Sequence, residues 1–242
     1  MNVIITGGSR GIGKELIKRY LNKATKIYAV ARDGKKLKEV ANLSSKVIPV
    51  ELDLSNLDEV LIFSKKMSNK NIDMVIANAG ISLPHSPNFT PFEEFKKTID
   101  INFLSVHALL SEIVPSMIKR RKGKIVLISS LASIVASPTS LPYSSSKRAL
   151  NSYAESLRNQ LAKYNIKVIN ILPGFIKTDM TAKNNFYMPF LMELEEGVDR
   201  IVYAIEKEKK EYAFPKRFYY LLKLFNALPI DFRDKILQKF AN

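Results

Sequence analysis

The sequence contains no cysteine and only two histidines among its 242 residues. The absence of cysteine excludes disulfide bonds, thiolate nucleophiles and cysteine-ligated zinc, and nothing in the chain demands an oxidising compartment. Two histidines are too few to build a metal site, and we interpret both His85 and His107 as structural or surface residues. The composition therefore predicts a protein without a bound metal.

Long hydrophobic runs and low-complexity tracts are also missing. No apolar run approaches the length of a membrane-spanning helix, and no linker rich in Pro, Gly or Ser and no internal repeat divides the chain. Because residues 2 to 6 already have the pattern of a buried strand, no room remains for a signal peptide. We expect a cytoplasmic protein whose residues 1–242 form a single domain.

Charge is plentiful but unbalanced, with 38 Lys and Arg residues against 23 Asp and Glu, a formal net charge of +15. Such an excess raises nucleic acid, an anionic membrane or an acidic carrier as partners. The basic residues are scattered over most of the expected helices, without an aromatic-interleaved stripe or a recognised nucleic-acid module. We therefore expect no nucleic-acid partner. The basic run at residues 119–122 is expected to be solvated, with docking of an acidic carrier as the alternative.

The apolar residues form short, mostly unbroken runs that alternate with amphipathic stretches. The runs lie at residues 3–6, 27–31, 47–52, 74–77, 125–129, 168–172 and 212–214. The amphipathic stretches lie at residues 11–21, 35–43, 56–67, 91–121, 143–164 and 195–207. Unbroken runs are typical of parallel strands covered on both faces. The pattern predicts an α/β fold, a doubly wound parallel sheet of seven strands between two layers of helices.

Two segments fall outside this alternation. Residues 178–194 follow the sixth strand, and because ligands of open α/β sheets bind beyond the carboxyl ends of the strands, this segment is a candidate lid. Residues 216–242 contain two apolar-rich helical patterns around Pro229, and Asp231 with Asp234 is expected to cap the second. We expect this tail to pack against the domain or a neighbouring subunit, with membrane contact as the less favoured alternative.

A glycine-rich turn joins the first expected strand to the first expected helix. Its sequence is Thr6-Gly7-Gly8-Ser9-Arg10-Gly11-Ile12-Gly13. A dinucleotide pyrophosphate needs a tight turn, a backbone without Cβ atoms where the phosphates approach, and free N–H groups at a helix N-terminus. Gly7, Gly11 and Gly13 are placed for these roles. An ordinary glycine-rich loop is the alternative, but the position of the turn favours a dinucleotide cofactor.

The second expected strand ends in Arg32, where NAD-binding proteins usually carry a carboxylate that accepts hydrogen bonds from the adenosine ribose. A guanidinium at this place would pair with a 2′-phosphate, and Arg10 in the glycine turn could add a second cation. Asp33 lies close enough to keep NAD(H) as an alternative. The sequence favours NADP(H).

Tyr143 and Lys147 are four residues apart in an expected helix and therefore share one face. Alone, such a pair is common by chance, and a surface pair is the alternative. Reducing a carbonyl by hydride builds negative charge on oxygen, so the site needs a proton donor and a second hydrogen-bond donor. Tyr143 would give the proton and Ser130 would polarise the carbonyl. The Lys147 cation would lower the pKa of the phenol, ordinarily about 10.

Together these motifs resemble the short-chain dehydrogenase/reductase family, NADP(H)-preferring type, over residues 2 to about 215. The resemblance implies that Ser130, Tyr143 and Lys147 are catalytic and that Asn102 completes a tetrad, linking Lys147 to solvent through a water. It implies a cofactor site that consists of Gly7, Ser9, Arg10, Gly11, Ile12, Gly13, Arg32, Asp53, Leu54, Asn78, Ala79, Gly80, Tyr143, Lys147, Pro173, Gly174, Ile176 and Thr178.

Within that resemblance, Asp53 would lie beside the adenine ring, Asn78 would steady the central sheet, and residues 173–178 would hold the nicotinamide amide. Asn102 has a second interpretation, as a polar residue that satisfies helix backbone at a local distortion. Ser129 is interpreted as a strand-end residue, and residues 144–146 as small residues that start a helix.

We therefore expect an NADPH-dependent carbonyl reductase or alcohol dehydrogenase, acting on a ketone, an aldehyde or a secondary alcohol. The alternatives are a 3-oxoacyl carrier-protein or lipid reductase working near a membrane, and an NADP(H)-binding regulatory protein without turnover. Apolar side chains in the candidate lid favour an apolar or acyl substrate. Because relatives pair through their two long helices, here 91–121 and 143–164, the resemblance implies a homodimer, with a tetramer as the alternative.

Overall fold

The computed structural model describes residues 1–83 and 89–239, so His85 lies outside the described residues. Seven parallel strands form one sheet in the order β3-β2-β1-β4-β5-β6-β7, which confirms the predicted doubly wound α/β fold. The strands are β1 (Asn2–Thr6), β2 (Lys26–Ala31), β3 (Val47–Glu51), β4 (Met74–Ala77), β5 (Gly123–Ile128), β6 (Ile166–Pro173) and β7 (Glu211–Phe214).

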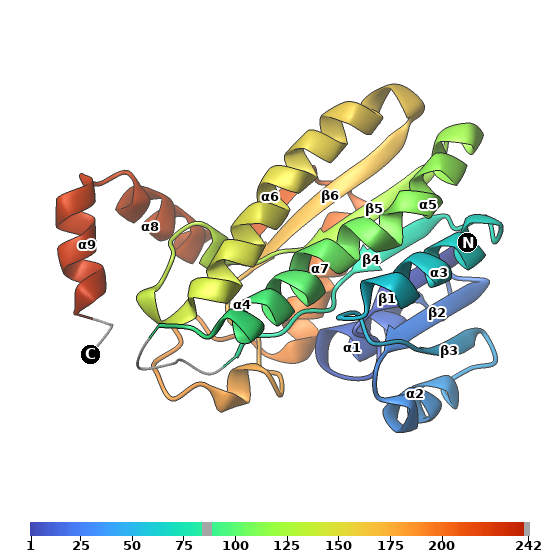
Figure 1. Cartoon of the computed structure of the whole chain (residues 1–242), viewed down its shortest axis with the longest axis horizontal. Helices are drawn as coiled ribbons and strands as arrows, with labels where there is room; N and C mark the ends of the chain where they lie inside the picture. Colours follow the sequence, from blue (N-terminus) through green and yellow to red (C-terminus); the bar gives the residue numbers. More distant parts are fainter. Residues whose placement is uncertain (84–88, 240–242) are drawn as a thin grey trace.

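Helices connect the strands and cover both faces of the sheet (Figure 1). The α-helices are α1 (Gly11–Tyr20), α2 (Gly34–Ala41), α3 (Leu57–Ser68), α4 (Phe92–Ile99), α5 (Ser105–Arg120), α6 (Leu141–Leu161), α7 (Leu194–Glu206), α8 (Lys216–Asn226) and α9 (Ile230–Gln238). The amphipathic stretches of the sequence therefore predicted the helices between the strands to within a few residues.

Alternate residues of each strand belong to opposite layers of the core, because successive side chains of a strand point to opposite faces. Ile4 packs in a cluster with α3, α5 and α6, whereas Val3 and Ile5 pack in a second cluster with α1, α2 and α7. Both neighbouring layers are apolar, which explains why the strand sequences are unbroken rather than alternating.

The register aligns the carboxyl ends of the central strands at one edge of the sheet. Thr6 of β1 lies beside Val30 of β2, while Ala77 of β4 lies beside Leu127 of β5. The loops that follow these strands therefore meet at a common place. The order in which the chain adds strands reverses between β1 and β4, and such a switch point is the usual ligand position in these folds.

The stretch Phe92–Arg120 is helical throughout but changes its winding in the middle. A short π-helix, η1 (Asp100–Leu104), separates α4 from α5. By length and composition alone, this stretch is apolar enough to cross a membrane, so the expectation that no segment reaches that length was wrong. Half of its apolar window is buried, largely where α5 packs on α3, so the core accounts for much of this apolarity.

The tail after β7 forms two helices, α8 and α9, as its apolar patterns indicated, but neither helix has a buried residue. Figure 1 shows both helices extending from one end of the sheet. The expected capping of α9 was wrong. Because α9 begins at Ile230, Asp231 falls inside its first turn, Asp234 forms an ion pair with Arg233, and no side chain caps the helix.

Candidate active site

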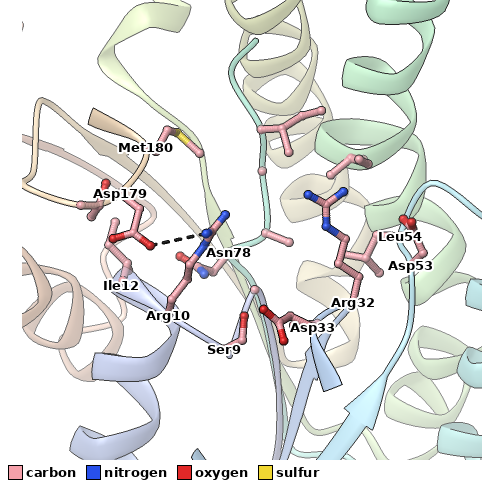
Figure 2. Close-up of a pocket in the computed structure, with 18 of the residues that line it drawn as sticks. Ser9, Arg10, Ile12, Arg32, Asp33, Asp53, Leu54, Asn78, Asp179 and Met180 are labelled. Atoms are coloured by element: carbon pink, nitrogen blue, oxygen red, sulfur yellow. Dashed lines mark ion pairs between the residues drawn. The ribbon is translucent and has the colours of Figure 1, made fainter. Parts of the chain in front are cut away.

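A cavity of about 290 Å³ opens at the carboxyl ends of β1, β2, β3 and β4. Figure 2 shows side chains from these strand ends and from the segment after β6 lining it. Of the residues that the sequence predicted for the cofactor, the lining includes Gly7, Ser9, Arg10, Gly11, Ile12, Arg32, Asp53, Leu54, Asn78, Ala79, Gly80 and Thr178. The fold therefore brings most of the predicted cofactor residues together around one cleft.

The N-terminus of α1 faces this cleft and differs from its neighbours. Asp33 caps α2 and Asn56 caps α3 through their side chains, whereas α1 has no side-chain cap and no acidic residue in its first turn. The first N–H groups of a helix lack partners within the helix and carry a partial positive charge. An anionic group in the cleft would satisfy these donors, as a pyrophosphate does at this position.

The glycine turn is packed too tightly for side chains at two of its positions. A Cβ atom at Gly13 would lie 2.1 Å from the Gly7 carbonyl oxygen, and one at Gly7 would lie 2.9 Å from Asn78 Nδ2. Gly11 has a φ of +51° but meets nothing closer than 3.6 Å, at Thr178. Gly13 therefore serves close packing, and Gly7 serves both close packing and a backbone φ of +68°. Gly11 serves the backbone conformation alone and leaves its space open toward the cleft.

Thr6 fixes the floor of the cleft. Its hydroxyl accepts hydrogen bonds from the backbone N–H groups of Asn78 and Ala79, both at 3.0 Å, and its carbonyl accepts one from Asn78 Nδ2 at 2.9 Å. These bonds join the turn after β1 to the loop after β4. Asn78 thus steadies the central sheet as expected.

Asp33, which follows β2, does not pair with either nearby arginine, Arg10 or Arg32. The Asp33 carboxylate accepts the backbone N–H of Lys36 at 3.0 Å and caps α2. Figure 2 shows the guanidinium groups of Arg10 and Arg32 both reaching into the pocket. Arg10 forms an ion pair of 3.4 Å with Asp179, which belongs to the segment after β6. Asp33 is therefore occupied by a helix end, and the exposed Arg32 is directed to the cleft.

Asp53 lies in the turn after β3 and accepts hydrogen bonds from Ser55 N at 2.9 Å and Ser55 Oγ at 2.8 Å. The bond from the backbone N–H is the main reason that the pKa of Asp53 is lowered, while partial burial opposes it. The carboxylate therefore stays ionised and its orientation is held by the turn.

Lys147 is buried, with 3% of its surface exposed, on the face of α6 that meets β5. Its Nζ donates a hydrogen bond of 2.8 Å to the carbonyl of Ile128 and lies 5.8 Å from the centre of the Tyr143 ring. Burial lowers the pKa of Lys147 to about 8, because the protein interior disfavours the charged form. The i, i+4 pair of the sequence is thus an interior pair rather than a surface one.

Tyr143 lies in the first turn of α6, which begins at Leu141, and its hydroxyl hydrogen-bonds with the Ser130 side chain. Burial raises the pKa of Tyr143, and the hydrogen bond with Ser130 opposes that rise. The sequence led us to expect that Lys147 would lower the pKa of Tyr143. In the protein without a bound cofactor, the pKa of Tyr143 is instead raised. Desolvation of the phenolate outweighs the opposing hydrogen bond with Ser130.

Asn102 lies within the π-helix η1, so the expected local distortion is present. Its amide pairs with the backbone of the loop after β4: Ile81 N donates to Oδ1 at 2.8 Å, and Nδ2 donates to the Ile81 carbonyl at 3.0 Å. Nδ2 also lies 3.0 Å from Ser146 Oγ. The side chain therefore satisfies the backbone of another segment and not that of its own helix.

Gly80 is the point at which these residues meet the cleft. A methyl group at Gly80 would lie 3.4 Å from both Asn102 Oδ1 and Lys147 Nζ, and Gly80 itself lines the cavity. Ser130, Tyr143, Lys147 and Asn102 come from three separate segments, which are the loop after β5, α6 and η1, and they gather next to Gly80. The arrangement can present a hydroxyl, a phenol and an ammonium group to one reacting centre.

Six of the predicted cofactor residues do not line the cavity: Tyr143 and Lys147, described above, and four others. Gly13 packs beneath the glycine turn, Pro173 ends β6, Gly174 donates its N–H to the Phe214 carbonyl at 2.7 Å, and Ile176 is buried and bridges to Met192. These residues support the walls of the cleft. Only Thr178, from the expected nicotinamide segment, reaches the lining.

Some residues with a clear part in the site were not predicted. Ser146 was interpreted only as a small helix-start residue. Its hydroxyl accepts a hydrogen bond from Asn102 Nδ2 and donates one to the Tyr143 carbonyl. Asp179 and Met180 line the cleft from the segment after β6. Their position beyond Thr178 in the candidate lid was the available signal. Ser129 behaves as expected, since its hydroxyl donates to the Lys147 carbonyl and ties β5 to α6.

In the part of the chain that the structure describes, His107 and the acidic residues do not gather into a metal centre. His107 Nδ1 lies 3.0 Å from the Tyr153 hydroxyl, a contact between α5 and α6, so its expected structural role holds. Within residues 1–83 and 89–239, no group of three or more His, Asp or Glu side chains is placed to hold a metal ion.

Comparison with known proteins gives consistent matches over most of the chain. A family model described as short chain dehydrogenase matches residues 1–187. An uncharacterized oxidoreductase of Myxococcus xanthus is 32% identical over 232 residues, which cover 93% of this chain and 92% of the relative. A fatty acyl-CoA reductase of Acinetobacter baylyi is 31% identical over 220 residues, covering 87% and 74%.

A solved structure agrees with the sequence matches. The crystal structure of a short chain dehydrogenase from Burkholderia cenocepacia in complex with NADP superposes with a TM-score of 0.81 and 25% identity. The superposition covers 93% of this chain and 92% of the other.

Proposed function

Because the chain belongs to the short-chain dehydrogenase family and is an NAD(P)-dependent oxidoreductase, we propose that it is an NADP(H)-dependent carbonyl reductase. The reaction converts a ketone or aldehyde into an alcohol, and runs in reverse on a secondary alcohol. One observation carries the proposal: Ser130, Tyr143 and Lys147 lie close together, and Lys147 adjoins Gly80, which lines the cleft.

The residues present fit an anionic dinucleotide. The uncapped N-terminus of α1 offers free N–H donors, and Gly11 leaves room for a phosphate to approach the backbone. Arg32 is directed into the cleft while Asp33 is engaged as a helix cap, which favours a 2′-phosphate over free ribose hydroxyls. The relative from Burkholderia cenocepacia, which binds NADP, supports this assignment.

Carbonyl reduction requires a hydride, which the nicotinamide would supply when bound, and a proton, which Tyr143 gives to the developing alkoxide. Ser130 donates a hydrogen bond to the same oxygen and so stabilises its charge in the transition state. Lys147, held by the Ile128 carbonyl, provides a positive charge near the phenolate that Tyr143 becomes. Asn102 holds the loop that carries Gly80 and Ile81, and so fixes the position of this loop beside Lys147.

The test replaces Tyr143 by Phe and follows NADPH absorbance against a panel of ketones and aldehydes. We expect kcat to fall by at least about a hundredfold, because the general acid is removed. NADPH binding, measured by the fluorescence of the cofactor, is expected to be unchanged. Tyr153→Phe is the matched control, since it removes a hydroxyl from the same helix at its contact with His107.

Turnover that survives in Tyr143→Phe, at a level similar to Tyr153→Phe, would contradict the proposed role of the phenol. NADPH binding without turnover of any carbonyl by the unmodified protein would favour a cofactor-binding protein that lacks activity.

A second candidate is a reductase of acyl thioesters or other lipid carbonyls. Two observations favour it: the 31% identical relative named fatty acyl-CoA reductase, and the exposed apolar side chains Phe186, Tyr187 and Phe190 in the segment after the cleft. We propose that this segment, residues 178–194, acts as a lid and that it contacts an acyl chain. A series of ketones of increasing chain length separates the candidates, because an apolar contact lowers KM with each added methylene.

A further inference from the structure

The helices α8 and α9 present an apolar surface that the rest of the chain does not cover. Figure 1 shows them projecting from the end of the sheet, away from β1 to β3. Their large exposed apolar side chains are Tyr220, Leu221, Leu224, Ile230 and Phe232, each more than half exposed. We call this set the tail surface. Exposed apolar side chains gathered on a protruding element are typical of an interaction site.

Helix α8 is apolar on two faces, and only one face has a partner within the chain. Phe218, Leu222 and Phe225 are half-buried, and the Phe218 ring stacks on Phe175 with centroids 6.1 Å apart. Tyr220, Leu221 and Leu224 have the spacing of a single helix face and are exposed. A helix that only packed on its own domain would carry polar residues at these outer positions. The outer face of α8 therefore needs an occupant from outside the chain.

The charge of the tail identifies the chemistry of that occupant. Residues 216–239 contain six Lys and Arg residues against two Asp. Lys216, Arg217, Lys235 and Lys239 are exposed, and Arg217 lies on the same face of α8 as Leu221 and Leu224. A second copy of the same surface would place these like charges against each other, on a chain whose formal net charge is +15. An anionic lipid surface complements both the apolar side chains and the cations.

We propose that α8 and α9 dock the protein on an anionic membrane surface, with Tyr220, Leu221 and Leu224 inserted at the level of the headgroups. The lid segment adjoins this site, because the rings of Phe190 and Phe218 have centroids 5.8 Å apart. Docking therefore brings residues next to the cleft close to the bilayer. The proposal concerns binding alone and does not depend on the proposed reductase activity.

The test is sedimentation of the full-length protein with vesicles of pure phosphatidylcholine and with vesicles that also contain phosphatidylglycerol. We expect binding to the anionic vesicles only, and binding that weakens as salt screens the cations. The double variant Leu221→Ser, Leu224→Ser is expected to bind at least about tenfold more weakly, because both apolar contacts are lost. Far-UV circular dichroism and thermal melting check that the variant is folded.

The matched control is the double variant Leu61→Ser, Ile62→Ser, which removes two exposed apolar side chains from α3. Leu61 and Ile62 are 42% and 69% exposed, and Leu221 and Leu224 are 56% and 69% exposed. This control is expected to bind vesicles like the unmodified protein. The proposal is overturned if anionic vesicles do not bind the protein. It is also overturned if Leu221→Ser, Leu224→Ser binds unchanged, which would mean attraction by the overall charge. A dimer that this variant dissociates, without vesicle binding, would assign the surface to a second copy.

Discussion

Lys147 is proposed to serve the reaction at the expense of the stability of the protein, and the loss of stability is large enough to measure. Burial lowers the pKa of Lys147 from 10.5 to about 8, a difference that corresponds to about 3 kcal/mol of unfavourable free energy for the charged form. Below about pH 8 the lysine is protonated in both the folded and the unfolded chain, so this cost is present in full. Lys147→Met removes the charge while keeping much of the side-chain volume.

The pH dependence separates this electrostatic cost from other effects of the substitution. Between about pH 8 and 10.5 the unfolded chain still holds the Lys147 proton that the folded chain has released. The free energy of unfolding of the unmodified protein therefore rises with pH in this window. We expect the stability of Lys147→Met relative to the unmodified protein to fall by about 2 kcal/mol between pH 7 and pH 10.

The loss of the hydrogen bond from Lys147 to the Ile128 carbonyl lowers the stability of the variant at both pH values, by about 1 to 3 kcal/mol. The loss of this hydrogen bond lowers the stability of the variant equally at pH 7 and at pH 10, so it does not change the difference between the two pH values. Urea denaturation followed by far-UV circular dichroism measures the effect, since the chain has no tryptophan. Lys167→Met, at an exposed position on β6, is the control. A stability difference between Lys147→Met and the unmodified protein that is the same at pH 7 and pH 10 would refute the reasoning.

Two further predictions concern the cofactor cleft. Gly13→Ala places a methyl group 2.1 Å from the Gly7 carbonyl oxygen, so this variant is expected to lose NADPH binding and to have a much lower Tm. Gly11→Ala costs about 1 kcal/mol of backbone strain, so its Tm is expected to fall by only a few degrees. Equal melting temperatures of the two variants would contradict this prediction. Arg32→Gln is expected to raise the KM for NADPH about tenfold or more and to leave the KM for NADH nearly unchanged, because only NADPH carries the 2′-phosphate. Parallel changes in KM for both cofactors in steady-state assays would contradict the pairing of Arg32 with the 2′-phosphate.

Local patterns in the sequence were sufficient to predict the sheet and most of the cleft. The unbroken strands required helices on both faces, and the order of strands and helices then determined which loops meet at the carboxyl edge. The glycine turn, Arg32 and Asn78 could be placed because each directly follows a strand or begins a helix. These inferences depend on chain order and periodicity, which a single sequence contains in full.

Features that depend on contacts between distant segments could not be predicted in this way. The partners of Ser146 and Thr6 lie 44 and 72 residues away, and a hydroxyl in a helix or strand does not indicate which partner it will meet. The capping of α9 was misjudged because one residue decides whether an aspartate precedes a helix or lies within it. The ion pair between Arg10 and Asp179 exists only because the segment after β6 folds back over the glycine turn.

The sequence by itself determined the class of fold, the order of its elements and the kinds of side chain available for chemistry, since these follow from periodicity and from residue type. The tertiary structure decided which environment each of those side chains has. Burial on α6 lowers the pKa of Lys147 and raises that of Tyr143, and projection from the sheet leaves α8 without a partner on its outer face. The physical reason is that solvation and contact depend on everything packed around a residue, and most of that lies far away along the chain.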